Sequence, residues 1–192
     1  QELSRGLMER RPSRMLQLLA DCGAAGRILP GVDVDARRLD WIDRAAALDA
    51  ALPVRCAVLG FGVPGLWERL RAPHEPQDLA ALLQRARAAI AAGPADARDT
   101  LALLERCDAL RRPQRFAQLL LAAQCVSTDE CRWAPARQWQ TALERVGAVD
   151  SAAISRDAAA RGLAGPAVGA AIRDARLAAL CHDRDPSLGK AP

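Results

Sequence analysis

Val54-Arg55-Cys56-Ala57-Val58-Leu59-Gly60-Phe61-Gly62-Val63-Pro64-Gly65 is the stretch of sequence on which the fold depends. Pro53 comes directly before it and suits the first turn of a helix, where its missing N–H would have no helical partner. The glycines at positions 60, 62 and 65, together with Pro64, then break the helix. The stretch therefore predicts a short helix that starts at Pro53 and ends at Gly60.

Helical spacing of apolar residues continues on both sides of this stretch, and no strand-like alternation stands out. The predicted helices are one that ends near residue 10 and others at residues 12–22, 35–51, 65–71, 76–92, 95–110, 113 onward, 135–147, 151–161 and 166–181. Alanine, leucine and arginine dominate the composition and are strong helix formers. We therefore predict an all-α, multi-helix bundle of roughly ten helices.

The bulk composition limits the class of protein. A chain of 192 residues with 51% hydrophobic content suits one domain, or two small ones that share a core. Its net charge of +4 is compatible with an anionic partner but does not require one. The six cysteines form no Cys-x-x-Cys pair and lack histidines at ligand spacing. With no signal peptide and no transmembrane run, we expect free thiols, a cytoplasmic location and no membrane partner.

Several blocks resemble bacterial CCA-adding tRNA nucleotidyltransferases that carry an HD domain. The opening stretch is similar to the family's Val-Arg-Phe-Ala-x-Leu-Cys-His-Asp-Leu-Gly-Lys. Upstream, residues 18–24 and 28–33 resemble Leu-x-Asp-Cys-Gly-Ala and Leu-x-Pro-Glu-Ile-Asp, and residues 1–3 resemble the end of the neck motif Glu-Arg-x-x-x-Glu-Leu. Downstream, residues 108–115 match Asp-Ala-x-Arg-Lys-Pro-x-Arg, and residues 162–179 are similar to Gly-x-x-Gly followed by Leu-x-x-x-Arg-Ile-x-Ala. The blocks are collinear and span almost the whole chain.

The chain departs from this family at the metal-binding positions. The aligned His and Asp positions are Phe61 and Gly62, which offer no imidazole or carboxylate to a divalent metal. The segment between Asp33 and Pro53 is shorter than in HD-carrying members, and residues 124–129 replace the family's Glu-Ala-Asp-x-x-Gly-Arg. We therefore expect no metal site, no catalytic residue and no HD phosphohydrolase activity in this chain.

The resemblance also implies a head that this sequence lacks. In the family, a Gly-Ser loop and an Asp-x-Asp pair hold the triphosphate and magnesium, and a Glu-Asp-x-x-Arg element selects CTP or ATP. None of these motifs occurs here, so they would precede Gln1. We expect this chain alone to transfer no nucleotide and to bind no cofactor, with Mg and CTP or ATP confined to the head.

Two groups of residues are candidates for RNA binding. Arg111, Arg112 and Arg115 offer guanidiniums for tRNA phosphates, or else brace a helix junction by pairing with Asp108. In the second group, Gly162 and Gly165 lead into a helix start, a typical anion site, while Arg173 and Arg176 lie three apart on one helix face. The alternative for the second group is a glycine-rich turn with a solvated arginine face.

Other conspicuous side chains have simpler interpretations. His182-Asp183 is an adjacent His-Asp pair, but it follows the last predicted helix and has only His74 as a further histidine, so we expect a surface tail. Trp41, Trp67, Trp133 and Trp139 are scattered along the chain, which favours core or interface packing over base stacking. The cysteines are expected to pack as small apolar groups.

The resemblance implies a domain layout and a function. Residues 1–33 would end the neck, with RNA- and primer-binding-like helices, residues 34–126 would form a degenerate HD-like body, residues 127–183 a helical tail, and residues 184–192 a loose C-terminus. Such a body would hold the acceptor and T arm of tRNA, with no DNA partner, while its own head and neck add C, C and A. The alternatives are the body of a bacterial poly(A) polymerase, a non-enzymatic helical interaction scaffold and, least favoured, a surviving phosphohydrolase.

Overall fold

The computed structural model describes residues 1–127 and 134–181, and these residues form helices and connecting turns with no strand. The helices are α1 (Glu2–Leu7), α2 (Ser13–Asp21), α3 (Ala25–Ile28), α4 (Ala36–Ala47), α5 (Leu52–Leu59), α6 (Leu66–Arg69), α7 (His74–Ala92), α8 (Ala97–Arg106), α9 (Pro113–Cys125), α10 (Pro135–Gly147), α11 (Ser151–Ala160) and α12 (Pro166–Cys181). The all-α class is thus confirmed. The predictions for Cys131, Trp133, His182, Asp183 and residues 184–192 lie outside the described residues.

Aspartates and prolines set most of the helix starts. Asp35, Asp96 and Asp150 each accept a hydrogen bond from the backbone N–H three residues later, at 2.8, 2.9 and 2.8 Å, and so cap α4, α8 and α11. Helices α9 and α10 begin at Pro113 and Pro135. Helices α10 and α12 have the bounds that the sequence predicts.

Some predicted boundaries are wrong. The helix predicted at residues 76–92 begins two residues earlier, at His74, and Pro76 lies in its first turn, where no N–H is needed. The helix predicted to reach residue 110 ends at Arg106, because Asp108 adopts a left-handed φ of 52° and the Ala109 N–H turns back to the Leu104 carbonyl at 2.9 Å. Helix α4 ends at Ala47, short of the predicted residue 51, for the same reason, because Asp49 adopts a left-handed φ of 49°. The short helix α3 was not predicted.

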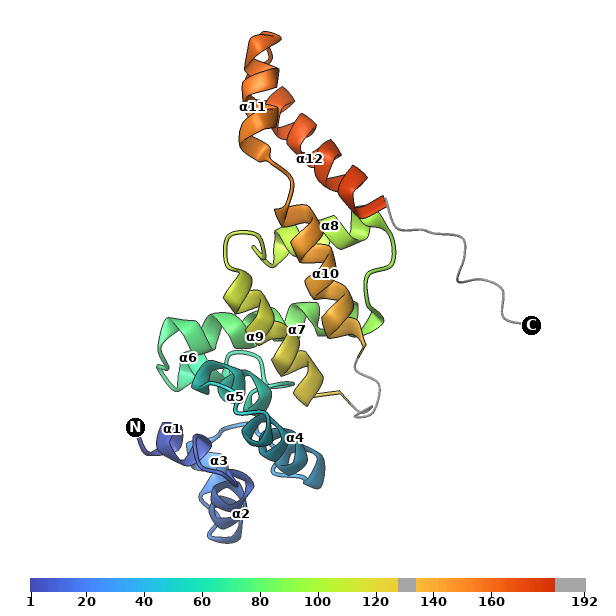
Figure 1. The fold of residues 1–192 in the computed structure, drawn as a ribbon. Helices are drawn as coiled ribbons and strands as arrows, with labels where there is room; N and C mark the ends of the chain where they lie inside the picture. The colour runs from blue at the N-terminus through green and yellow to red at the C-terminus, as the bar shows by residue number, and fades with distance from the viewer. Residues whose placement is uncertain (128–133, 182–192) are drawn as a thin grey trace, which may run out of the picture.

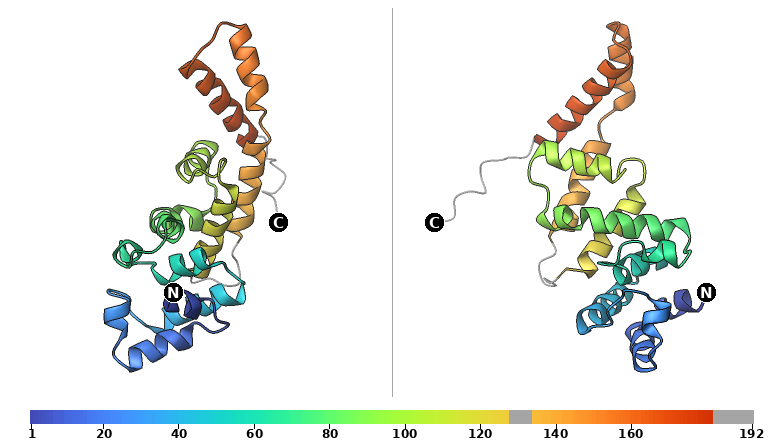
Figure 2. Two further views of the ribbon diagram at one scale, coloured as in Figure 1. Left: turned by 90° about the vertical axis from the view of Figure 1, so that its left-hand side faces the viewer. Right: turned by 180° about the vertical axis from the view of Figure 1, so that it is seen from behind.

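The helices are arranged along one long direction (Figure 1). Helices α1 to α4 lie at one end, α7 to α10 form the middle, and α11 with α12 makes a hairpin that projects from the opposite end, as both further views also show (Figure 2). Helix α5, the predicted short helix, packs against α4, α7 and α9. It therefore joins the first helices of the chain to the middle of the molecule.

One hydrophobic core runs through residues 7–146, and α5 is buried along most of its length. Trp67 and Trp139 are buried, and their indole N–H groups donate to the carbonyls of Cys56 and Ile90, both at 3.0 Å. Trp41 is buried against the Phe61 ring, with ring centroids 5.8 Å apart. Packing is thus confirmed for these three tryptophans.

The α11–α12 hairpin contributes little to that core. Ala158 is the one fully buried residue of α11, and α12 has none. Helix α12 reaches back to α8 and α10, where Leu177 and Leu180 pack partly buried against the core. Within the described residues, no helix is both long enough and apolar enough to span a bilayer.

Candidate functional site

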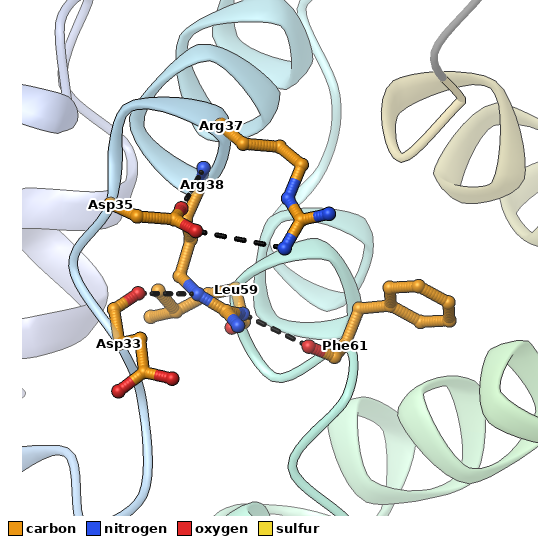
Figure 3. A network of polar contacts seen from close by, with 6 residues as sticks. All are labelled: Asp33, Asp35, Arg37, Arg38, Leu59 and Phe61. Atoms are coloured by element: carbon orange, nitrogen blue, oxygen red, sulfur yellow. Dashed lines mark hydrogen bonds and ion pairs between the residues drawn. The ribbon is translucent and has the colours of Figure 1, made fainter.

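A corner between α4 and the end of α5 contains Phe61 and Gly62, and it is organised by Arg38 (Figure 3). The Arg38 side chain donates from Nε to the Asp33 carbonyl at 2.8 Å, and from Nη1 to the carbonyls of Leu59 at 2.5 Å and Phe61 at 3.0 Å. Leu59 is the last residue of α5, so the guanidinium lies at the negative end of that helix. The corner is therefore held by a cation of the chain itself.

Burial disfavours the charged form of Arg38, and nearby carboxylates favour it. The residue is 9% exposed. Burial lowers the pKa of its guanidinium, while the charges of Asp35 and Asp33 raise it and that of Arg37 lowers it. The three carbonyl acceptors compensate for the loss of water around the ion. The geometry thus describes a satisfied buried arginine rather than a free reactive group.

The residues of this corner do not fit a divalent metal. The carbonyl of Phe61 faces Arg38, whereas its ring extends away from the guanidinium (Figure 3) and packs edge-on against Trp41. Gly62 adopts a left-handed φ of 84°. A phenyl ring and a glycine hydrogen stand where a metal would need anionic or imidazole ligands, and in residues 1–127 and 134–181 no group of three or more His, Cys, Asp or Glu could hold a metal ion. We derive no metal-dependent step for this chain.

The buried thiols are not reactive groups either. Burial raises the pKa of Cys56 to about 12 and that of Cys125 to about 11. Cys22, Cys56, Cys107, Cys125 and Cys181 are all free thiols. Because the thiolate is the nucleophile, Cys56 and Cys125 remain protonated and inert near neutral pH.

The first predicted arginine group lies at the turn between α8 and α9. Arg112 pairs with Asp108 at 3.5 Å, and Arg115 donates from Nη2 to the Cys107 carbonyl at 3.0 Å. Arg111 is exposed. Two of the three guanidiniums therefore brace the junction, while Arg111 leaves its charge free to meet an anion.

The second predicted group lies in the projecting hairpin. Gly162 and Gly165 have left-handed φ values of 74° and 55°, and a Cβ at either would meet nothing within 4 Å, so conformation rather than close contact explains these glycines. At the start of α12, the amides of Ala167 and Gly169 already donate to the carbonyls of Ala164 and Gly165, at 3.3 and 3.4 Å. This helix start therefore offers fewer free amides than the sequence suggests.

The arginines of α12 turn back toward the rest of the molecule. Arg173 makes a two-pronged pair with Glu105 of α8, with Nε–Oε1 and Nη2–Oε2 distances of 3.3 and 3.2 Å. Arg176 donates from Nη2 to the Ser151 hydroxyl of α11 at 3.5 Å. Because Glu105 lies in the last turn of α8, Arg173 meets the turn where the first arginine group begins. The structure thus brings Arg173 of the second group to the end of α8 from which the first group follows.

Sequence reasoning missed two buried arginines. Arg38 is one, and Arg55 is the other: it donates to the carbonyls of Ala50, Leu7 and Glu9 at 2.7, 2.8 and 2.9 Å, and so fastens α5 to the end of α1. All acceptors of both arginines are backbone carbonyls. No pattern of side chains in the sequence signals such partners, because every residue has a carbonyl.

Comparison with known proteins gives a consistent set of relatives. The chain is 44% identical to the CCA-adding enzyme of Bordetella bronchiseptica, covering 93% of this chain and 48% of that protein. It is 40% identical to the multifunctional CCA protein of Verminephrobacter eiseniae and 34% identical to that of Leptothrix cholodnii, in each case covering 95% of this chain and 55% of the relative. No protein-family model and no solved structure matches the chain.

The chain spans about half the length of the curated relatives that it matches. It is homologous to the C-terminal half of bacterial CCA-adding enzymes and multifunctional CCA proteins. The family resemblance drawn from the sequence blocks is thus confirmed.

Proposed function

We propose that this chain is the tRNA-holding helical region of a cytoplasmic CCA-adding tRNA nucleotidyltransferase. The observation that carries the proposal is the 44% identity to a CCA-adding enzyme over 93% of the chain. In this proposal a head that precedes the region binds Mg and CTP or ATP and adds C, C and A, while the helices hold the acceptor and T arm at a fixed distance. A poly(A) polymerase body would share this architecture, and the nucleotide added by the head distinguishes the two.

The shape and charge of the molecule support a holding role. The helices form an elongated molecule whose hairpin projects at one end (Figure 2). Double-stranded RNA is recognised mainly by its shape and by contacts to phosphates and 2′-hydroxyls, which arginines supply without a large net charge. A net charge of +4, almost all of its cations arginine, fits that mode of binding.

The proposed contact residues are Arg111, Arg112, Arg115, Gly162, Gly165, Arg173 and Arg176. Arg111 is the strongest of them, because it is exposed and makes no ion pair within the described residues. A phosphate bound by Arg173 would have to share the guanidinium with Glu105, and one bound by Arg115 would have to share it with the Cys107 carbonyl. We place Arg112 between these cases, because its pair with Asp108 is long and its side chain is 58% exposed.

The test is a titration of the chain with tRNA at about 50 and 200 mM salt, with a DNA hairpin of the same size as control. We expect binding that prefers tRNA and weakens with salt. Arg111→Ala should reduce the slope of log K against log salt by about 1, and Arg173→Ala with Arg176→Ala by about 1–2. Equal binding of DNA would contradict the proposal. Dimerisation without RNA affinity would instead favour the interaction scaffold.

A further inference from the structure

A hollow of about 220 Å³ lies between the end of α5, α6 and α7, and it shares no lining residue with the Arg38 corner or with the two arginine groups. Leu66, Trp67 and Ala80 line it and are buried, which makes its floor apolar. Glu68 and Arg85 also line it, both are exposed, and neither makes an ion pair within residues 1–127 and 134–181. The hollow thus combines an apolar floor with one free acid and one free base.

One face of α7 supplies the side of the hollow that carries polar amides. Gln77, Ala80, Ala81 and Gln84 all line the hollow, and their spacing of i, i+3, i+4 and i+7 places them on one helix face. The two alanines are small and leave space between the two glutamines, which lie about 10 Å apart along the helix axis. The space suits a single flat ring system, because drug-sized ligands occupy pockets of about 300–1,000 Å³.

Both glutamines are held in place by a hydrogen bond to the backbone. Gln84 donates from Nε2 to the Gly60 carbonyl at 3.1 Å, and Gln77 donates from Nε2 to the Ala72 carbonyl at 2.6 Å. Within the two described ranges neither side chain makes a further hydrogen bond. Each amide therefore keeps its oxygen as an acceptor and its second N–H as a donor, side by side and already oriented.

We propose that this hollow binds an adenine nucleotide. Adenine presents a donor at N6 beside an acceptor at N7, and a glutamine amide meets both at once. Gln77 reads the base, because it lies at the opposite end of the α7 face from Arg85, which binds the phosphate. Glu68 accepts a hydrogen bond from a ribose hydroxyl. The nucleotide is either an unpaired one in RNA, which rests on the proposed function, or a free one, which does not.

The first arm of the test measures binding of AMP, adenosine and IMP by calorimetry. The wild-type chain should bind AMP about tenfold more tightly than IMP, which lacks the N6 amino group. Arg85→Gln should weaken AMP binding about tenfold and leave adenosine binding unchanged, because only the phosphate contact is lost. Arg98→Gln is the matched control, since Arg98 is an exposed arginine of α8 that does not line the hollow, and it should bind AMP as the wild type does. Equal binding of AMP and IMP would overturn the adenine assignment.

The second arm fills the hollow. Ala81→Leu places a larger side chain in existing space, so it should prevent binding of AMP and adenosine without lowering the Tm of the free chain. Ala88→Leu is its control, because Ala88 is an exposed alanine two turns further along α7, outside the hollow. Ala81→Leu that binds AMP as tightly as Ala88→Leu would overturn the site.

The third arm separates the two sources of the nucleotide. Displacement of AMP from the wild-type chain by tRNA assigns the hollow to an unpaired nucleotide of RNA, whereas AMP that stays bound beside tRNA assigns it to a free nucleotide. If the wild type binds no AMP, and Ala81→Leu binds tRNA as tightly as Ala88→Leu, the site is overturned. Absence of tRNA binding by the wild type would count against the proposed function and leave the AMP measurements to decide the site.

Discussion

At the scale of single residues, Arg38 decides how the end of α5 meets α4. Three carbonyl oxygens, of Asp33, Leu59 and Phe61, depend on its one guanidinium. We predict that Arg38→Met lowers the free energy of unfolding by about 3 kcal/mol, because buried acceptors lose charge-assisted hydrogen bonds. Urea unfolding followed by circular dichroism measures the change.

The neighbouring arginine supplies the control for that prediction. Arg37 has a side chain that is 66% exposed and pairs with Asp35 at 3.6 Å. Its guanidinium also lies 5.2 Å from the centroid of the Trp41 ring, so Arg37→Met should lower the free energy of unfolding by no more than about 1 kcal/mol. Equal losses for the two variants would show that Arg38 does not hold the corner.

The residue types in the sequence predict part of the chemistry of this corner. Phe61 and Gly62 predict the loss of metal ligands, since that conclusion needs nothing but the chemistry of two side chains. The role of Arg38 was not foreseeable, because its acceptors are backbone carbonyls and two of them lie 21 and 23 residues away. For Arg173 the sequence predicts a phosphate contact or a solvated helix face, yet Arg173 pairs with Glu105 across 68 residues. Such pairings follow from tertiary packing rather than from local spacing.

At the scale of helices, proline and glycine signals located the elements well, and two of the boundary errors share one cause. The ends of α4 and α8 fall early because Asp49 and Asp108 take the left-handed conformation that sequence reasoning reserves for glycine. Helix α7 begins at His74, ahead of the predicted start at Pro76, because a proline in a first turn costs no hydrogen bond. The local rules thus predict that a helix exists better than where it ends.

The α11–α12 hairpin leads to a prediction about elements. Ala158 is its one fully buried residue, and Leu177 and Leu180 are its partly buried contacts with the core. A chain that ends at Val149 should still unfold cooperatively, with a free energy of unfolding lower by about 2 kcal/mol for the two half-buried leucines. Urea unfolding followed by tryptophan fluorescence tests this.

A second truncation gives the contrast. A chain that ends at Ser127 also loses α10, whose Trp139 is 2% exposed and lies edge-on to Phe116 at 6.4 Å between ring centroids. Exposing that face should abolish cooperative unfolding, since burying one large aromatic side chain is worth roughly 3 kcal/mol or more. If removal of the hairpin alone also abolishes cooperative unfolding, the hairpin is part of the cooperative unit.

At the scale of the whole molecule, the sequence predicts the class but not the arrangement. Composition and periodicity define helices and their apolar faces, which is enough for an all-α bundle. They do not say that α5 joins the first helices to the middle, because that position depends on contacts such as the Arg55 bonds to Leu7 and Glu9, over 40 residues away. The projecting hairpin is likewise a result of tertiary packing (Figure 1).

The free energy of unfolding of the whole chain should fall in alkaline solution, because buried thiols ionise more readily once the chain is unfolded. Burial raises the pKa of Cys56 to about 12 and of Cys125 to about 11, from an ordinary value of 9.0. A raised folded pKa means that stability is fully present below about pH 9 and is lost as pH rises toward 11 and 12, because the unfolded thiols ionise first. Each thiol contributes a slope of about −1.4 kcal/mol per pH unit within its window. The chain has no tyrosine, and Lys190 is its only lysine, so the other groups that titrate there are chiefly the remaining cysteines, among them Cys107, whose pKa burial also raises. Urea unfolding at intervals from pH 8 to about 11 gives the slope.

The double variant Cys56→Ala with Cys125→Ala should make this slope shallower. An unchanged slope in that variant would mean that these two buried thiols do not control alkaline unfolding.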